Sequence, residues 1–150
     1  MEPSEGIITA SSAAAPVGVP APAVVDSASA ARAYAESVAR AQWGGPGRTV
    51  REEDVVDLLL VVSELVTNAI RHGDGLAGFE VRPMPEGLWI AVHDHSEVVP
   101  RAAYAFPTTH PGGGYGWPLV ARLARDIAVD PREGGGKTIS VLVPLRPAST

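Results

Sequence analysis

The strongest hydrophobic pattern in the chain predicts a long, deeply buried helix over residues 52–72. Apolar side chains recur there at spacings of three and four residues, which places them on one face of a helix. The stripe is wide, so we expect burial over most of the helix circumference. Gly73 follows at the position where helices commonly end on glycine. The stripe consists of Val55, Leu58, Leu59, Val61, Val62, Leu65, Val66, Ala69 and Ile70.

Two shorter helices are also predicted. The first covers about 27–42, with Asp26 or Ser27 as its cap, and it has an apolar face at helical spacing. A run of glycines around a proline ends it. The second covers 117–128 and carries Pro118 in its first turn, where a missing backbone N–H does no harm.

Strands are predicted where short apolar runs lie between turn residues. Residues 79–82 and 88–94 form a hairpin around a proline-containing turn at 83–87. A glycine-rich turn at 132–136 leads into a final strand over 137–144, in which apolar side chains alternate with their neighbours.

This order of elements predicts an α+β two-layer sandwich, with a mostly antiparallel mixed sheet and helices packed on one face. We expect a single domain over 24–145 and a loop at 95–111. Residues 1–23 are rich in alanine, proline and serine, so we expect a flexible segment that contributes at most an edge strand at 18–25. Residues 146–150 are expected to form a tail.

Composition and charge narrow the classes of function. The 150 residues carry a net charge of −5 and no stripe of lysine and arginine, which argues against direct binding of nucleic acid. The absence of cysteine excludes disulfides and thiolate metal sites. No basic region precedes an apolar stretch at the N-terminus, and the longest apolar run, 55–62, is too short to span a membrane. We therefore expect a cytoplasmic protein that does not bind membranes.

Candidate chemistry begins with Glu64 and Asn68. They are four residues apart, so they share one face of the long helix. A carboxylate and a carboxamide one turn apart can reach a hydrated Mg²⁺ or a phosphate, because Mg²⁺ prefers hard oxygen ligands and keeps several waters. Taken alone, such a pair more often belongs to an ordinary solvated helix face.

Asp94 and the glycines of 112–116 are further candidates for binding a nucleotide. Asp94 ends a buried strand, where a carboxylate can accept a hydrogen bond from an exocyclic amino group such as that of adenine. It can equally cap a turn. The glycines of 112–116 lead into a helix, and glycine-rich backbone at a helix start can hold a phosphate. A loop tip is the alternative.

A P-loop, a zinc site and a hydrolase triad each fit the sequence less well than a Mg²⁺ and nucleotide site. Gly136, Lys137 and Thr138 resemble the end of a P-loop, but Pro131 stands where its first glycine belongs and a strand follows in place of a helix. A zinc site would lack ligands, and no Gly-x-Ser-x-Gly elbow supports a Ser–His–Asp hydrolase.

The motifs together resemble a known superfamily more closely than any one of them does. Residues 64–73, 92–94 with Pro100, 112–116 and 136–138 match in order and spacing the ATP-binding domains of anti-sigma-factor serine kinases, sensor histidine kinases and DNA gyrase. This histidine-kinase-like ATPase superfamily has the Bergerat fold. Within it, the chain looks like the small stand-alone, anti-sigma-factor-like proteins common in actinobacteria.

The resemblance implies a role for each matched residue. Glu64 would be the catalytic residue that orients or deprotonates the attacking group, and Asn68 would coordinate Mg²⁺. Asp94 would bind the adenine amino group, and Thr138 would support the adenine pocket through Asp94 or a water. The glycines of the lid that wraps the triphosphate would be Gly112, Gly114 and Gly116.

The chain departs from the family pattern after Asp94 and in the lid. Ser96 stands where a glycine or small residue is usual, and it follows an unusual His95. Gly113 and Tyr115 occupy lid positions that commonly hold arginine and leucine, and Trp117-Pro118 replaces small or aliphatic residues. These differences bear on phosphoryl transfer more than on nucleotide binding.

Two hypotheses of function follow. In the first, the chain is an ATP-dependent serine/threonine kinase of the anti-sigma type, with ATP and Mg²⁺ as cofactors. It would phosphorylate or sequester a partner such as a sigma factor or an anti-anti-sigma factor. In the second, it is a nucleotide-gated interaction module with little or no kinase activity. The family precedent is compatible with a homodimer.

Overall fold

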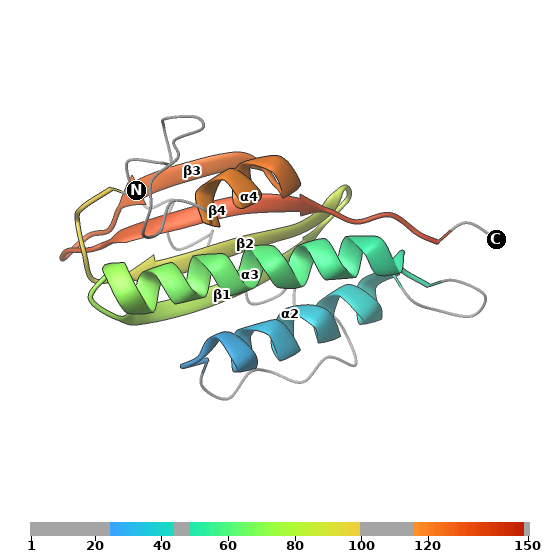
Figure 1. Cartoon of the computed structure of the whole chain (residues 1–150), viewed down its shortest axis with the longest axis horizontal. Helices are drawn as coiled ribbons and strands as arrows, with labels where there is room; N and C mark the ends of the chain where they lie inside the picture. The colour runs from blue at the N-terminus through green and yellow to red at the C-terminus, as the bar shows by residue number, and fades with distance from the viewer. Residues whose placement is uncertain (1–24, 44–48, 100–115, 149–150) are drawn as a thin grey trace, which may run out of the picture.

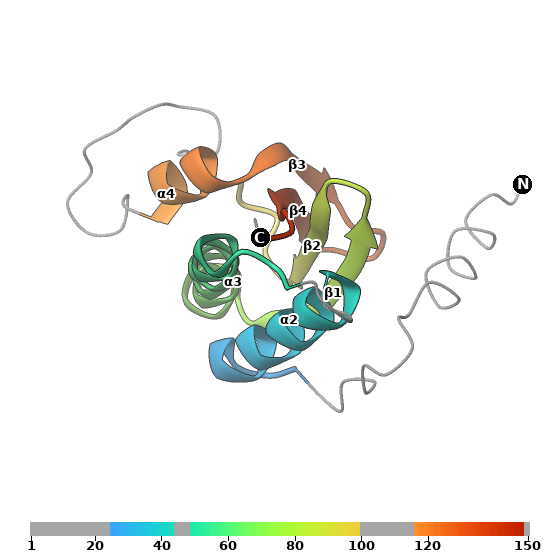
Figure 2. The same cartoon turned by 90° about the vertical axis from the view of Figure 1, so that its right-hand side faces the viewer.

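The computed structural model describes residues 25–43, 49–99 and 116–148, and it folds them into two layers. Three helices lie on one face of a four-stranded sheet (Figures 1 and 2). In chain order the elements are α2 (Ala28–Trp43), α3 (Glu52–His72), β1 (Leu76–Met84), β2 (Gly87–Asp94), α4 (Gly116–Leu123), β3 (Arg125–Pro131) and β4 (Lys137–Pro144).

The sheet has the strand order β1-β2-β4-β3, and each neighbouring pair is antiparallel. The predicted α+β sandwich with helices on one face is therefore confirmed. The strands β2 and β4 lie at the centre, where Asp94 is the register partner of Lys137. This register brings the end of one central strand against the start of the other.

Helix α3 carries most of the helical layer. It packs on β2 and β4 and lies between α2 and α4 (Figure 2). Its three acidic residues in the first turn and basic residues in the last turn match the helix dipole. Leu59 and Ile70 lie at the margin of the predicted stripe, and Ile70 is exposed. The helix residues buried in the core are Val55, Leu58, Val61, Val62, Leu65, Val66 and Ala69.

One predicted element is wrong in part. The helix expected over 117–128 ends at Leu123, and 125–131 forms the edge strand β3. Asp126 has a φ of 56°, which breaks the helical path, and Ala128 and Val129 pair with β4 instead. The run Ile127-Ala128-Val129 is too short to distinguish a strand from a helix by periodicity, so pairing with β4 decides its conformation. The edge strand expected at 18–25 lies almost wholly outside the described residues.

The chain after β4 is hydrogen-bonded to the start of α3. The buried carboxylate of Asp54 accepts the backbone N–H of Arg146 at 2.9 Å and its guanidinium at 3.0 Å. Pro147 forms a β-bridge with Val50. Residues 146–148, expected to be part of a tail, therefore pack against the domain.

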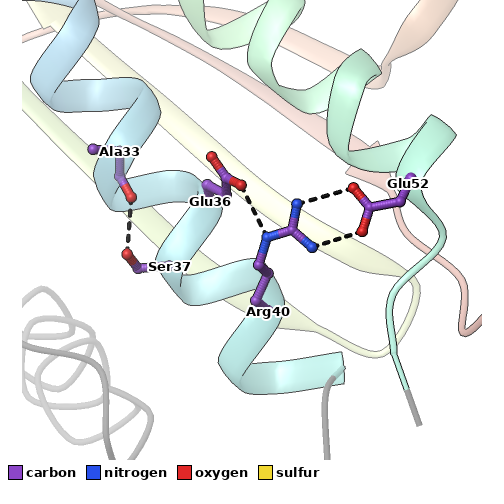
Figure 3. Close-up of polar contacts among 5 residues, drawn as sticks. All are labelled: Ala33, Glu36, Ser37, Arg40 and Glu52. Carbon is purple, nitrogen blue, oxygen red and sulfur yellow. Dashed lines mark hydrogen bonds and ion pairs between the residues drawn. The ribbon is translucent and has the colours of Figure 1, made fainter.

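A second polar contact joins α2 to α3 on the surface. Arg40 bonds to Glu36 one turn earlier at 2.9 Å and forms two bonds to Glu52, at 2.8 and 3.0 Å (Figure 3). All three side chains are more than a third exposed. Water and salt screen such pairs, so this bridge contributes little to stability.

We predict that Asp54→Ala lowers the free energy of unfolding by about 1–3 kcal/mol, because it leaves the backbone N–H of Arg146 without its buried acceptor. Arg40→Ala is the control, and it should cause a much smaller decrease. Urea denaturation followed by circular dichroism measures both. Equal losses in the two variants would contradict the assigned role of Asp54.

Candidate functional site

The orientation of α3 decides where Glu64 and Asn68 lie. The hydroxyl of Ser63 accepts a hydrogen bond from Arg32 of α2 at 3.0 Å, so this flank of α3 faces α2. Successive helix residues are rotated by about 100°. Helix α4 lies on the other side of α3 from α2 (Figure 2). The rotation therefore puts Glu64 and Asn68 on the flank toward α4, and both residues are partly buried.

Asn68 has an unsatisfied amide. Its Nδ2 atom is buried, and it has no hydrogen-bond partner among the residues that the structure describes. A buried polar atom without a partner costs about 1–3 kcal/mol, so native structures seldom keep one without a reason. The side chain fits a nucleotide site, because Nδ2 can donate to a phosphate oxygen. After an amide flip, the oxygen can bind Mg²⁺ or one of its waters.

The carboxylate of Glu64 lies on the same flank of α3 as Asn68. It has no ion-pair partner within the described ranges, although Arg71 follows two turns later on that side of the helix. A carboxylate with this freedom can accept a proton or a hydrogen bond from a bound molecule.

Asp94 lies at the junction of α3, β2 and β4. Its carboxylate is almost fully buried, at 3% exposure of the residue. Oδ1 accepts the backbone N–H of Ser96 at 3.0 Å, and Oδ2 lies 2.9 Å from the ammonium of Lys137. The ammonium also donates to the carbonyl of Ser96 at 3.1 Å. Ser96, a departure from the family pattern, thus forms the turn that holds both charges.

Two glycines make room for Asp94. A Cβ on Gly73 would lie 2.6 Å from Oδ2, and a Cβ on Gly136 would collide with the carbonyl oxygen of Asp94. Gly73 was expected as a helix-ending residue, but its φ is −105°, so close approach and not a left-handed conformation requires glycine. The predicted tight turn at 132–136 is confirmed.

The hydroxyl of Thr138 lies at His93 and not at Asp94. Its oxygen is 2.6 Å from Nδ1 of His93, whose Nε2 is 2.6 Å from Glu80 (Oε2). These three side chains lie on the sheet face away from the helices. The structure therefore brings Lys137, and not the hydroxyl of Thr138, to Asp94. Strand alternation could have shown this, because residue 138 points away from its neighbours 137 and 139.

The remaining predicted site residues belong to the glycine-rich segment. Gly112 and Gly114 lie outside the described residues, as do Gly113 and Tyr115, and Gly116 is the first residue of α4. Trp117 is 5% exposed and belongs to the core cluster, which agrees with a packing role.

The described ranges hold neither a metal-binding cluster nor a membrane-spanning helix. No group of three or more histidine and acidic side chains there could hold a metal ion. None of the helices in those ranges is both long enough and apolar enough to cross a bilayer.

Within the described residues, the α+β domain holds an asparagine amide without a partner, a glutamate without an ion pair on the same helix flank, and a buried aspartate at the end of a central strand. This combination fits a nucleotide-binding protein. The family comparison agrees. Residues 21–142 match the histidine kinase-like ATPase domain, and the chain belongs to this family. No curated protein and no solved structure matches. Membership of the family implies an ATP site.

We predict that Gly136→Ala destabilises the fold much more than Gly134→Ala. Both glycines have a φ of 88°, so each alanine costs about 1–2 kcal/mol of backbone strain. Only residue 136 adds a collision with the backbone of Asp94, whereas a Cβ at 134 meets nothing within 4 Å. Thermal unfolding of the two variants measures the difference, and equal midpoints would contradict the close approach.

A second prediction concerns acid stability. The hydrogen bond from His93 lowers the pKa of Glu80 below its ordinary value, and Arg82 adds to the effect. A carboxylate with a lowered folded pKa stabilises the fold above its unfolded pKa, and this stabilisation is lost as pH falls through the folded pKa. Glu80→Gln should therefore lower the unfolding midpoint at pH 6, and the difference from wild type should shrink below about pH 4. A constant difference across that range would refute the assignment.

Proposed function

We propose that the chain binds Mg-ATP and acts as a serine/threonine kinase of the anti-sigma type on a partner regulator. The observation that carries the proposal is the buried amide of Asn68, which has no partner among the described residues and lies one helical turn from Glu64, in a chain of the histidine kinase-like ATPase family. Asn68 would hold the Mg²⁺, with Asp94 at the adenine end. The glycines at 112, 114 and 116 would cover the phosphates.

The proposed chemistry is an in-line phosphoryl transfer. Mg²⁺ would supply charge neutralisation on the phosphates. A serine hydroxyl of the partner would attack the γ-phosphorus, and the bond from that phosphorus to the β–γ bridging oxygen would break to leave ADP. Glu64 would orient the hydroxyl and accept its proton. Its position on the same helix face as Asn68 supports this role.

Partner and setting belong to the proposal as well. A sigma factor or an anti-anti-sigma factor would be the protein partner, in the cytoplasm, and the kinase could work as a homodimer. These features come from the family resemblance alone.

The proposal predicts that Glu64→Gln abolishes phosphate transfer and leaves Mg-ATP affinity within about twofold. A catalytic base typically contributes 10²–10⁴-fold to rate. The measurement uses labelled Mg-ATP with a candidate anti-anti-sigma protein, and calorimetry for binding. Glu53→Gln, an exposed acid on the same helix, is the matched control and should keep full activity. Unchanged transfer in Glu64→Gln would rule out the proposed role.

The same experiment distinguishes the kinase from the nucleotide-gated interaction module. A nucleotide-gated interaction module would bind its partner only with Mg-ATP and form no phosphoserine. The departures from the family pattern at Gly113, Tyr115 and Trp117-Pro118 favour this alternative, because they bear on phosphoryl transfer more than on nucleotide binding.

A further inference from the structure

We infer that Lys137 is a specificity-determining residue of the nucleotide site, and that it reads the base together with Asp94. The inference rests on the proposed nucleotide binding and adds a residue that the family pattern does not assign. Lys137 and Asp94 are register partners on the two central strands, and their charged groups lie 2.9 Å apart. Their side chains are 5% and 4% exposed.

Both side chains point toward the helical layer. Val92 and Ile139, two residues away on each strand, are core residues, and a period of two puts Asp94 and Lys137 on the same face as them. That face also carries α3 with Asn68. Thr138 points to the opposite face, so Lys137 is the residue of this turn that a ligand under the helices would meet.

Stability alone does not account for the pair. A buried ion pair loses most of its Coulombic gain to desolvation, and apolar side chains of similar size often stabilise such positions as well or better. The next positions on this face of β4, Ile139 and Val141, are apolar and buried. A lysine at 137 is therefore better explained by a ligand than by packing.

The pair keeps unused hydrogen-bonding capacity. An ammonium has three donors, and Lys137 uses two of them within the described residues, on Asp94 and on the carbonyl of Ser96. Each carboxylate oxygen has two lone pairs, and each has one such partner. A donor and an acceptor therefore remain side by side. Glycine at 73 lets the end of α3 pack directly against this carboxylate, because a Cβ there would lie 2.6 Å from Oδ2.

Adenine matches this arrangement. Its amino group at C6 is a donor, and the adjacent ring nitrogen N1 is an acceptor. The amino group donates to Asp94, and N1 accepts from Lys137. Guanine presents the inverse pattern, an oxygen at C6 and a hydrogen on N1, so donor would face donor and acceptor would face acceptor. Unpaired buried groups of this kind give strong discrimination.

The test compares ATP with 1-deaza-ATP, in which a C–H group replaces N1 and the amino group is unchanged. Calorimetry with Mg²⁺ and the full chain gives both affinities for wild type and for Lys137→Met, which keeps an unbranched stem without the charge. We expect wild type to bind ATP about 10- to 100-fold more tightly than 1-deaza-ATP, the usual effect of one hydrogen bond to a charged group. In Lys137→Met the ratio should fall to about one.

The matched control is Arg132→Met. Arg132 is a second cation on Asp94, but it donates to the backbone carbonyl at 2.9 Å and not to the carboxylate. This variant should keep the wild-type preference for ATP. A ratio that falls in Arg132→Met as much as in Lys137→Met would attribute the preference to general charge and overturn the inference.

The other possible results distinguish a failure of this inference from a failure of the proposed function. Equal wild-type affinities for the two nucleotides would overturn the inference, and this comparison does not depend on the folding of any variant. Tighter binding of both nucleotides by Lys137→Met, with an unchanged ratio, would show that Lys137 only competes for Asp94. Binding of neither nucleotide to wild type would refute the proposed function itself.

Discussion

The packing of α3 against β2 and β4 is the contact on which the rest of the structure depends. Each fully buried valine or leucine contributes about 1.5–3 kcal/mol, and α3 buries six of them in the core. The exposed bridge from Arg40 to Glu52 contributes far less. Apolar burial therefore sets the rotation of α3, and the polar contacts act on a helix whose position is already decided.

That rotation also creates the candidate site. The centre of the buried face contacts the sheet, and the flank with Ser63 contacts α2. Glu64 and Asn68 are left on the flank toward α4, partly buried and without competing partners in the described part of the chain. A surface helix would have exposed the same pair to water, where the amide of Asn68 would be fully hydrated. Burial of the helix leaves this amide without a partner among the described residues.

Periodicity predicted the fold wherever an element was long or bounded by clear turn residues. The bounds of α3 follow from its wide stripe and Gly73, and β4 follows from the turn before it. The strand β3 could not be predicted in this way, because its seven residues have no clear period and depend on pairing with β4. Its place at the sheet edge is a tertiary effect that local sequence does not encode.

Motifs, and not periodicity, pointed to the candidate site, and they pointed to only part of it. Motif order and spacing single out Glu64, Asn68 and Asp94, and the roles given to them stay predictions. The role given to Thr138 came from the motif alone, although strand alternation puts residue 138 on the opposite face from 137 and 139. Lys137 was missed because strand alternation was not applied to the residues after the glycine turn, and a lysine in such a place is usually a solvated charge.

The end of the sheet combines features that are individually unfavourable. A carboxylate and an ammonium are buried together, and glycine is required at 73 and 136 to let three segments approach. The backbone of Asp94 is held by Arg132, and that of His95 by Gly73. A fold selected only for stability would place apolar side chains here, as it does at the next positions of β2 and β4. These features, each unfavourable for stability, are concentrated at the end of the central strands. They lie beside the C-terminal half of α3, which carries Glu64 and Asn68. This clustering is what a preorganised binding site requires, because groups fixed in advance need no rearrangement when the ligand arrives.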